Sequence, residues 1–341
     1  MSVFFKLLKK VNYLIIPLCI ISLIVSVCAI VSVKHMKQKQ TKNINRIMRD
    51  IERDMARMRR LFKAQNYEPE FIKLEKFAAL DAIDPAIYTA GLSEMKKHKV
   101  VIAGIARDNA DDLAIMMRHI ESLGELFADY RVVIFENDSI DGTKEILSKW
   151  KKRNSKVSIL MKDFGNIKRP SIQFLADARN YYLDEFMGNE SYRNFDLMVA
   201  VDMDMSYGFD LRGIEHSFSQ YDKWDMVCSN GISNSKGETY DMFAFRSAEF
   251  PGALYNTPNY YKNVTLKGQQ QVFKPGDDLF PIFSGFGGMA IYKREFLKDC
   301  HYESVHDDCE HVALHECMLK RHARIFLNPA QVIRYSHFDV K

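Results

Sequence analysis

The sequence lacks any two cysteines spaced as Cys-x-x-Cys, which excludes the zinc and dithiol sites that such pairs form. It also lacks a strong charge of one sign, because 48 Lys and Arg residues stand against 44 Asp and Glu residues, for a net charge of +4. Part of this small excess lies near the amino terminus, so nothing indicates a nucleic-acid-binding protein. With 341 residues, 47% of them hydrophobic, the chain can form one large domain with accessory segments, or two domains.

The six cysteines fall into two groups. Cys19 and Cys28 lie in an apolar segment near the amino terminus. The other four can form disulfides in a secretory lumen or stay reduced in a cytosol, and their spacing does not choose between these states. These four are Cys228, Cys300, Cys309 and Cys317.

Residues 11–33 are almost wholly apolar and are long enough to cross ~30 Å of hydrocarbon as a helix. The apolar run continues directly into Lys34 without a small-residue cleavage site, so we predict an uncleaved membrane anchor after a short tail, residues 1–10. Basic residues follow the span more densely than they precede it, which favours a cytosolic carboxy-terminal part, although a long domain can be translocated regardless.

Residues 34–63 contain no Gly or Pro, and apolar residues recur there at steps of three and four. This pattern predicts an amphipathic helix, which either pairs with its copy in a homodimer or packs on its own domain. We assign residues 34–98 as helical stem and connector.

From residue 99, predicted strands and helices alternate, which is typical of an α/β domain with a mostly parallel sheet and flanking helices. A later segment, 231–280, is long and rich in aromatic residues, Gly and Pro, as expected of an acceptor-binding region. The predicted strands are 100–105, 132–135, 157–161, 197–201, 225–229 and 289–292, and the predicted helices are 111–127, 143–150, 171–186 and a stretch that ends at 322.

Asp202 and Asp204 directly follow the apolar strand 197–201. Residues two apart in an extended chain point the same way, so the two carboxylates leave the strand as a pair. Ligands bind at that end of strands in open α/β sheets, and hard divalent cations prefer such oxygen ligands. The pair predicts a site for a metal and a nucleotide; the alternative is a solvated turn that ends the strand.

Polar turns follow two other predicted strands at the same edge. Acids and amides there can bond ribose hydroxyls or a base edge, whereas the alternative is a turn with a helix cap. The residues that we assign to donor binding on these turns are Arg107, Glu136, Asn137, Asp138 and Asp141.

Five motifs occur in order: ENDSxDGT at 136–143, LADARN at 175–180, VDMD at 201–204, YDMFAFR at 240–246 and SGFGG at 284–288. In this order they resemble the GT-A class of nucleotide-sugar-dependent glycosyltransferases, and more closely the capsule-associated α-mannosyltransferases of glycosyltransferase family 69. The resemblance covers about residues 99–337. It implies a Rossmann-like GT-A domain, which we place at residues 99–341, after the membrane helix and stem.

The resemblance also implies roles for single residues. Asp202 and Asp204, with His337 as a late ligand, would hold Mn2+ or Mg2+ on the donor diphosphate. Arg179 and Asn180 would face the donor phosphates or sugar. The residues implied for acceptor binding are Asp241, Arg246, Gly287 and Gly288.

Glycosyl transfer needs a carboxylate that deprotonates the acceptor or stabilises an oxocarbenium-like centre. We prefer Glu310, with Asp308 and Asp307 as further candidates and a helix-capping acid as the alternative. Residues 307–311 depart from the family pattern, which weakens the inference of mannose.

The sequence is therefore interpreted as a single-pass, membrane-anchored hexosyltransferase. Mannose is the favoured sugar, carried by GDP-mannose or else by a UDP-sugar, and the acceptor is a glycan or glycolipid hydroxyl. A sugar nucleotidyltransferase is disfavoured because residues 104–108 hold one Gly only, and a noncatalytic membrane scaffold is disfavoured by the intact acid pair.

Two signals on membrane orientation conflict. Acceptor sequons begin at Asn137, Asn189 and Asn263 and are usable only in a secretory lumen, whereas the basic flank favours the cytosol. For a eukaryotic source the resemblance implies a Golgi-type type II protein, with Asn137 unmodified because it lies in the expected donor turn.

Overall fold

The computed structural model describes residues 79–165, 171–232, 239–249 and 273–334, which belong to one compact unit. The predicted anchor and stem helix, the sequon at Asn263 and the expected metal ligand His337 lie outside these residues, as does much of the expected acceptor region. Within the described ranges, no helix combines the length and apolarity needed to cross a membrane.

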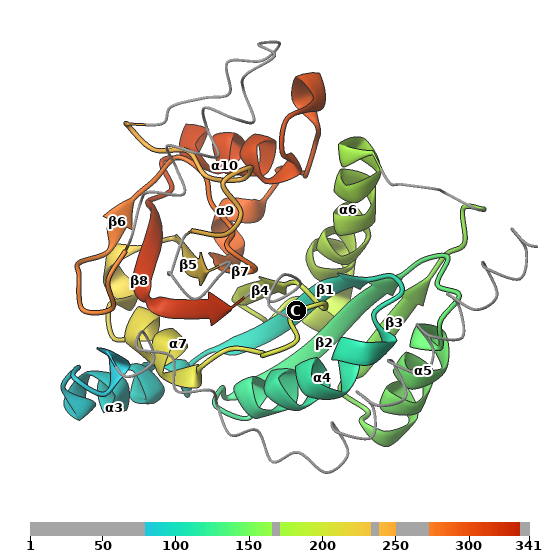
Figure 1. The fold of residues 1–341 in the computed structure, drawn as a ribbon, viewed down its shortest axis with the longest axis horizontal. Coiled ribbons are helices and arrows are strands. Elements are labelled where there is room, and N and C mark those ends of the chain that lie inside the picture. The colour runs from blue at the N-terminus through green and yellow to red at the C-terminus, as the bar shows by residue number, and fades with distance from the viewer. Residues whose placement is uncertain (1–78, 166–170, 233–238, 250–272, 335–341) are drawn as a thin grey trace, which may run out of the picture. The chain divides into compact units, whose positions relative to one another are not determined.

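The described chain forms an eight-stranded sheet in the order β3-β2-β1-β4-β7-β5-β8-β6 (Figure 1). Its first four strands are parallel, and the predicted alternation with helices is confirmed. These strands are β1 (Lys99–Ala106), β2 (Asp129–Glu136), β3 (Val157–Met161) and β4 (Leu197–Val201). The helices between them are α4 (Ala110–Gly124), α5 (Thr143–Arg153) and α6 (Ile172–Gly188).

The other half of the sheet is less regular than the sequence predicts. Strand β7 (Met289–Lys293) runs antiparallel between β4 and β5 (Met226–Ile232). Beyond β5 lie β8 (Ile325–Arg334), which the sequence analysis did not predict, and the two-residue antiparallel strand β6 (Phe280–Pro281). The register of β7 pairs Met289 with Val201, so the chain before β7 meets the carboxyl end of β4.

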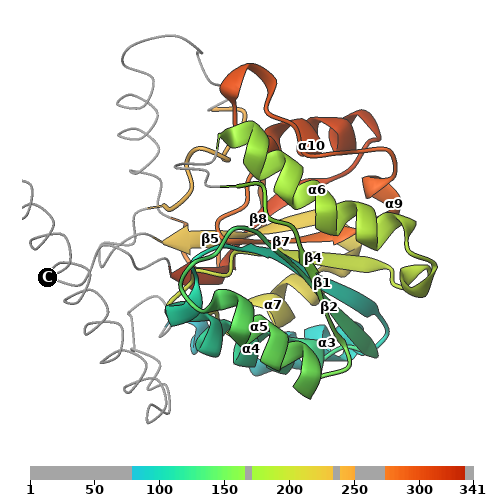
Figure 2. The same cartoon turned by 90° about the vertical axis from the view of Figure 1, so that its right-hand side faces the viewer.

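Helices cover both faces of the sheet (Figure 2). Helices α6 and α10 (Glu310–Lys320) contribute to one hydrophobic core, and α4, α5 and α7 (Leu211–Phe218) contribute to a second core. Helix α3 (Pro85–Met95) packs on α7. The other helical elements of the described ranges are α9 (Arg294–Leu297), η1 (Glu190–Tyr192), η2 (Tyr221–Lys223) and η3 (Val305–Asp307).

Strand β4 is buried along its whole length, as its continuous apolar run predicts. Successive side chains of a strand point to opposite faces, so Met198 and Ala200 enter the first core while Val199 and Val201 enter the second. Both faces are thus covered, and the strand presents polar groups only where it ends, at Asp202.

Candidate functional site

The carboxyl ends of β1, β2 and β4 lie at one edge of the sheet, because the three strands are parallel and adjacent. Asp202 leaves β4 there, and its backbone NH donates a 2.9 Å hydrogen bond to the carbonyl of Gly288. The antiparallel strand β7 therefore brings the glycine motif to the Asp pair, a contact that the order of motifs along the chain does not predict.

Arg179 on α6 is the central cation of this site and is only 6% exposed. Its Nη2 donates to Oδ1 of Asp202 at 3.3 Å, and its Nε donates to Oε1 of Glu310 at 2.9 Å. The guanidinium also lies 4.9 Å from the ring centre of Phe286. The structure thus brings together the expected metal-site acid, the expected donor-binding arginine and the expected acceptor base.

Asp241, expected at the acceptor site, belongs to the same electrostatic cluster. Burial raises its pKa to about 7, and the nearby carboxylate of Glu310 adds to this effect. Its Oδ2 accepts a 3.2 Å hydrogen bond from the backbone of Gly287, and its φ of 65° is unusual for a residue with a side chain. Asp241 is partly exposed, and its carboxylate adds negative charge beside Asp202.

Asp202 is held in an environment that disfavours its charge. Burial raises its pKa to about 8, in part offset by Arg179, while the carboxylates of Asp204 and Asp241 raise it further. Asp202, Asp241 and Glu310 thus interact with one guanidinium, and Asp204 adds a fourth carboxylate beside Asp202. A cation bound at this cluster would therefore relieve repulsion among like charges.

The donor set is the hard oxygen type that Mg2+ and Mn2+ prefer. Such ions are commonly held by one or two carboxylates and by substrate phosphates, which Asp202 and Asp204 fit. In the ranges that the structure describes, no group of three or more His, Cys, Asp or Glu side chains could hold a metal ion. Asp202 and Asp204 alone therefore fit one side of such a site, with the remaining ligands left to the donor or to residues outside these ranges.

At the end of β2, Glu136 is fully buried, and burial raises its pKa. Its Oε1 accepts a 3.0 Å hydrogen bond from the backbone of Ser139, whereas its Oε2 has no hydrogen-bond partner among the described residues. An unsatisfied carboxylate oxygen at this edge is suited to a ligand hydroxyl. Arg107, at the end of β1, lies with its Nε 4.0 Å from the carboxylate of Asp108.

The other acids of the donor turn bond the protein's own backbone. Asp141 accepts hydrogen bonds from the amides of Thr143 and Ala110, both at 3.0 Å, and so caps the starts of α5 and α4. Asp138 accepts from the amides of Phe164 and Gly165. For these two acids the turn-and-cap alternative describes the geometry better than a ligand role.

Asn137 also bonds a group of the protein itself. Its Nδ2 donates to Asp138 at 3.0 Å, and only 4% of the residue is exposed.

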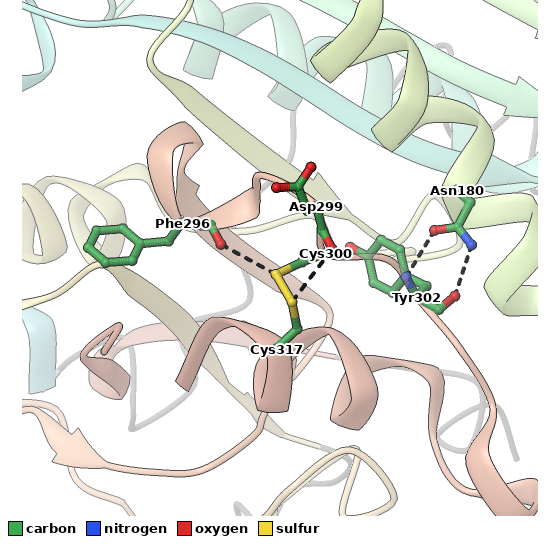
Figure 3. The surroundings of a disulfide bond; sticks show 6 residues. All are labelled: Asn180, Phe296, Asp299, Cys300, Tyr302 and Cys317. Carbon is green, nitrogen blue, oxygen red and sulfur yellow. Dashed lines mark hydrogen bonds between the residues drawn. A yellow bond between two sulfur atoms is a disulfide. The ribbon is translucent and has the colours of Figure 1, made fainter. Parts of the chain in front are cut away.

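Three other expected site residues also bond groups of the protein itself. Asp308 forms a buried 2.6 Å ion pair with Arg246, whose Nη1 also donates to the carbonyls of Phe243 and Phe245. This pair joins the chain around Arg246 to the segment just before α10. Asn180 likewise bonds the backbone of Tyr302 through both polar atoms of its amide (Figure 3).

Gly287 and Gly288, expected at the acceptor site, lie in a tight turn. Gly287 and Gly288 have φ values of 61° and 89°. A Cβ on Gly287 would lie 2.3 Å from the carbonyl oxygen of Ser229, and one on Gly288 would lie 3.0 Å from Sδ of Met205. Close approach to the protein itself therefore explains both glycines.

Sequence reasoning missed several aromatic and histidine neighbours of this cluster. The His311 ring stacks on Phe286 at 4.1 Å, and its Nε2 lies 3.6 Å from Oε1 of Glu310. In the part of the chain that the structure describes, neither ring nitrogen has a hydrogen-bond partner. Burial holds the pKa of His311 well below its usual value. The EH dipeptide offered a signal for this residue, whereas nothing in the sequence pointed to Tyr182 or Tyr302.

The structure also settles the open cysteine states. Cys300 and Cys317 form a disulfide with a Cα–Cα distance of 5.7 Å, and Cys228 and Cys309 are free and buried.

Comparisons with known proteins give one matching family and a set of similar solved structures. Residues 99–322 match the family described as Cryptococcal mannosyltransferase 1. A comparison with curated proteins gives no match. Similar solved structures include the mannosyltransferase PcManGT from Pyrobaculum calidifontis in complex with GDP-Man and Mn2+, at 14% identity and a TM-score of 0.44, covering 75% of this chain and 67% of that chain. Another is S. aureus TarS 1-349, at 15% identity and a TM-score of 0.41, where the match covers 70% of this chain but only 60% of that chain.

Proposed function

Because the chain belongs to the family of Cryptococcal mannosyltransferase 1 and is a glycosyltransferase, we propose that it transfers mannose from GDP-mannose to a hydroxyl of a glycan or glycolipid. The donor would lie along the carboxyl ends of β1, β2 and β4. The family description favours mannose over other hexoses. A UDP-sugar remains the alternative donor, and the retaining or inverting outcome is open.

One observation carries this proposal, namely the convergence of Asp202 and Glu310 on Arg179. The two acids bond different nitrogens of a single guanidinium, so a diphosphate at one acid and a hydroxyl at the other would be close in space. Holding two reactants in one orientation is a large part of what an enzyme supplies.

Each residue then has a defined task. Glu310 would accept the proton of the acceptor hydroxyl or face the oxocarbenium-like centre, and Arg179 holds its carboxylate in place at 2.9 Å. The unpartnered Oε2 of Glu136 would accept a hydrogen bond from a ribose hydroxyl or base edge of the nucleotide. Asp202 and Asp204 would hold Mn2+ or Mg2+, which when bound supplies positive charge that stabilises the departing diphosphate.

We further propose that residues 11–33 anchor the protein in a membrane with the catalytic domain in a secretory lumen. The Cys300–Cys317 disulfide supports this orientation, because disulfides persist in oxidising compartments and are rare in the cytosol. The basic flank after the span argues for the opposite side.

The test uses the full chain in detergent, with GDP-mannose and a set of UDP-sugars as donors. We expect release of GDP from GDP-mannose that requires Mn2+ or Mg2+ and stops with excess chelator. If the protein turns over only a UDP-sugar, that UDP-sugar would be the donor in place of GDP-mannose. If it turns over no nucleotide sugar, the proposal is refuted. Release of pyrophosphate from GTP and mannose 1-phosphate would instead favour a nucleotidyltransferase.

A further inference from the structure

The segment between α9 and α10 is fastened to two helices. The Cys300–Cys317 disulfide joins it to α10, as Figure 3 shows. Two residues along, the backbone of Tyr302 is held by Asn180 of α6. Asn180 Nδ2 donates to the Tyr302 carbonyl at 2.8 Å, and the Tyr302 amide donates to Asn180 Oδ1 at 2.9 Å. These two hydrogen bonds fix the position of the Tyr302 backbone, and so the point from which the Tyr302 side chain extends.

The Tyr302 side chain points into the core and is 1% exposed. Its hydroxyl accepts a 3.0 Å hydrogen bond from the hydroxyl of Tyr182, which in turn accepts one from Arg179 Nη1 at 3.5 Å. The two hydroxyls are protonated at neutral pH at their ordinary pKa of about 10, and burial raises the pKa of each further. A continuous path of hydrogen bonds thus runs from the clamped loop to the central guanidinium.

Arg179 is held in three directions by this arrangement. Nε faces Glu310, Nη2 faces Asp202, and Nη1 faces the tyrosine pair. A guanidinium is a planar fork, so its orientation decides whether both acids are bonded at once. The tyrosine pair is the contact that does not itself carry a charge, and its removal leaves both acids in place.

We propose that Tyr302 is a positioning residue of the transferase, which acts through Tyr182 to fix the orientation of Arg179. This inference rests on the proposed function for its kinetic consequence but not for its structural one. The competing explanation is that Tyr302 only fills the core, since its ring packs edge-on against His311 at 5.3 Å. The substitution Tyr302→Phe separates the two, because it keeps the ring and removes the hydroxyl.

The kinetic test measures turnover of GDP-mannose by the full chain in detergent. For Tyr302→Phe we expect kcat to fall about tenfold, with a KM for GDP-mannose within about twofold of the wild-type value. A misoriented Arg179 would reduce the stabilisation of the transition state more than the binding of the donor. The matched control is Tyr192→Phe, which removes a buried hydroxyl that lies 3.5 Å from Ser158 and leaves the Arg179 contacts intact. We expect this control to turn over GDP-mannose normally.

A double-mutant cycle then distinguishes positioning from packing. In an Arg179→Lys background the Tyr302→Phe substitution should have no further effect on kcat, because the fork that Tyr302 orients is gone. The proposal would be overturned if Tyr302→Phe lowered kcat by the same factor in the Arg179→Lys background as in the wild type. It would also be overturned if Tyr302→Phe alone had a wild-type kcat.

A second measurement is independent of activity. In arginine-selective 15N NMR, the Nε–H signal of Arg179 is identified by its loss in Arg179→Lys. Its protection from solvent exchange should fall in Tyr302→Phe and stay unchanged in Tyr192→Phe. Unchanged protection in Tyr302→Phe would overturn the positioning role whatever the kinetics, whereas reduced protection in a protein that turns over no nucleotide sugar would support that role and refute the proposed function.

Discussion

Nε of Arg179 lies 2.9 Å from Oε1 of Glu310, although 131 positions separate the two residues. The same guanidinium bonds Asp202, so one buried cation serves the acid beside the proposed metal and the acid proposed as base. Removing one member of a buried ion pair leaves an uncompensated charge, so substitutions here should keep the shape of the side chain.

Glu310→Gln should lower kcat by about 100-fold while the affinity for GDP changes little, because an amide keeps the shape but takes no proton. The matched control is Glu316→Gln, an exposed position on the same helix, which should retain wild-type activity. Steady-state kinetics and GDP binding by calorimetry measure the two effects. A loss confined to GDP affinity would move Glu310 to the donor site.

Asp202→Asn and Asp204→Asn should each reduce transfer by about 100-fold or more, because each weakens the cation site without opening a cavity. The folded state should persist, as judged by circular dichroism and thermal unfolding. Asp177→Asn, an exposed acid on α6, serves as the control. Full activity of either active-site variant in excess chelator would contradict a metal role.

His315 should make the protein acid-sensitive. Burial lowers its pKa to about 3, and it lies neutral between Ser284 and Tyr292. The unfolded chain takes up this proton near pH 6.5, so the stabilisation is present above that pH and is lost as the pH falls towards 3. Denaturant unfolding from pH 7 to pH 4 should show a slope that His315→Gln reduces by about 1.4 kcal/mol per pH unit. Equal slopes would place the acid sensitivity elsewhere.

The disulfide should stabilise the domain by about 3 kcal/mol, given the 17-residue separation of Cys300 and Cys317. Dithiothreitol should therefore lower the unfolding temperature of the wild-type chain. The double variant Cys300→Ser/Cys317→Ser should match the reduced wild type and show no further response to the reductant. An unchanged unfolding temperature on reduction would mean that the bond does not form in the protein.

Membrane orientation can be tested in sealed microsomes that carry the expressed protein. We expect the domain from residue 99 onward to resist protease until detergent is added. Asn137 should remain unglycosylated there, because it is 4% exposed and its Nδ2 is bonded to Asp138. Digestion without detergent would place the domain in the cytosol and refute the lumenal proposal.

Much of the parallel half of the fold can be read from local patterns. The apolar run of β4 needs two covered faces, and the alternation with α4, α5 and α6 supplies them. The two acids that follow must then appear at the ligand-binding edge. These conclusions depend on periodicity and on strand ends, which neighbouring residues determine.

The partners of polar groups could not be predicted in this way. Asp308 and Glu310 are two positions apart, yet one faces Arg246 and the other Arg179, because α10 begins between them. Which acid meets which arginine depends on how α10 packs on α6 and on the loop of Arg246, and these contacts span long stretches of chain.

The place of the antiparallel strand β7 in the sheet could not be predicted from local patterns either. Its residues read as a short apolar strand, but its position between β4 and β5 follows from pairing with strands far away in sequence. That pairing brings Gly288 to Asp202 and leaves the glycine motif with a packing role. Local propensity sets the kind of element that forms, whereas burial and hydrogen-bond satisfaction across the assembled sheet set which side chains meet at the site.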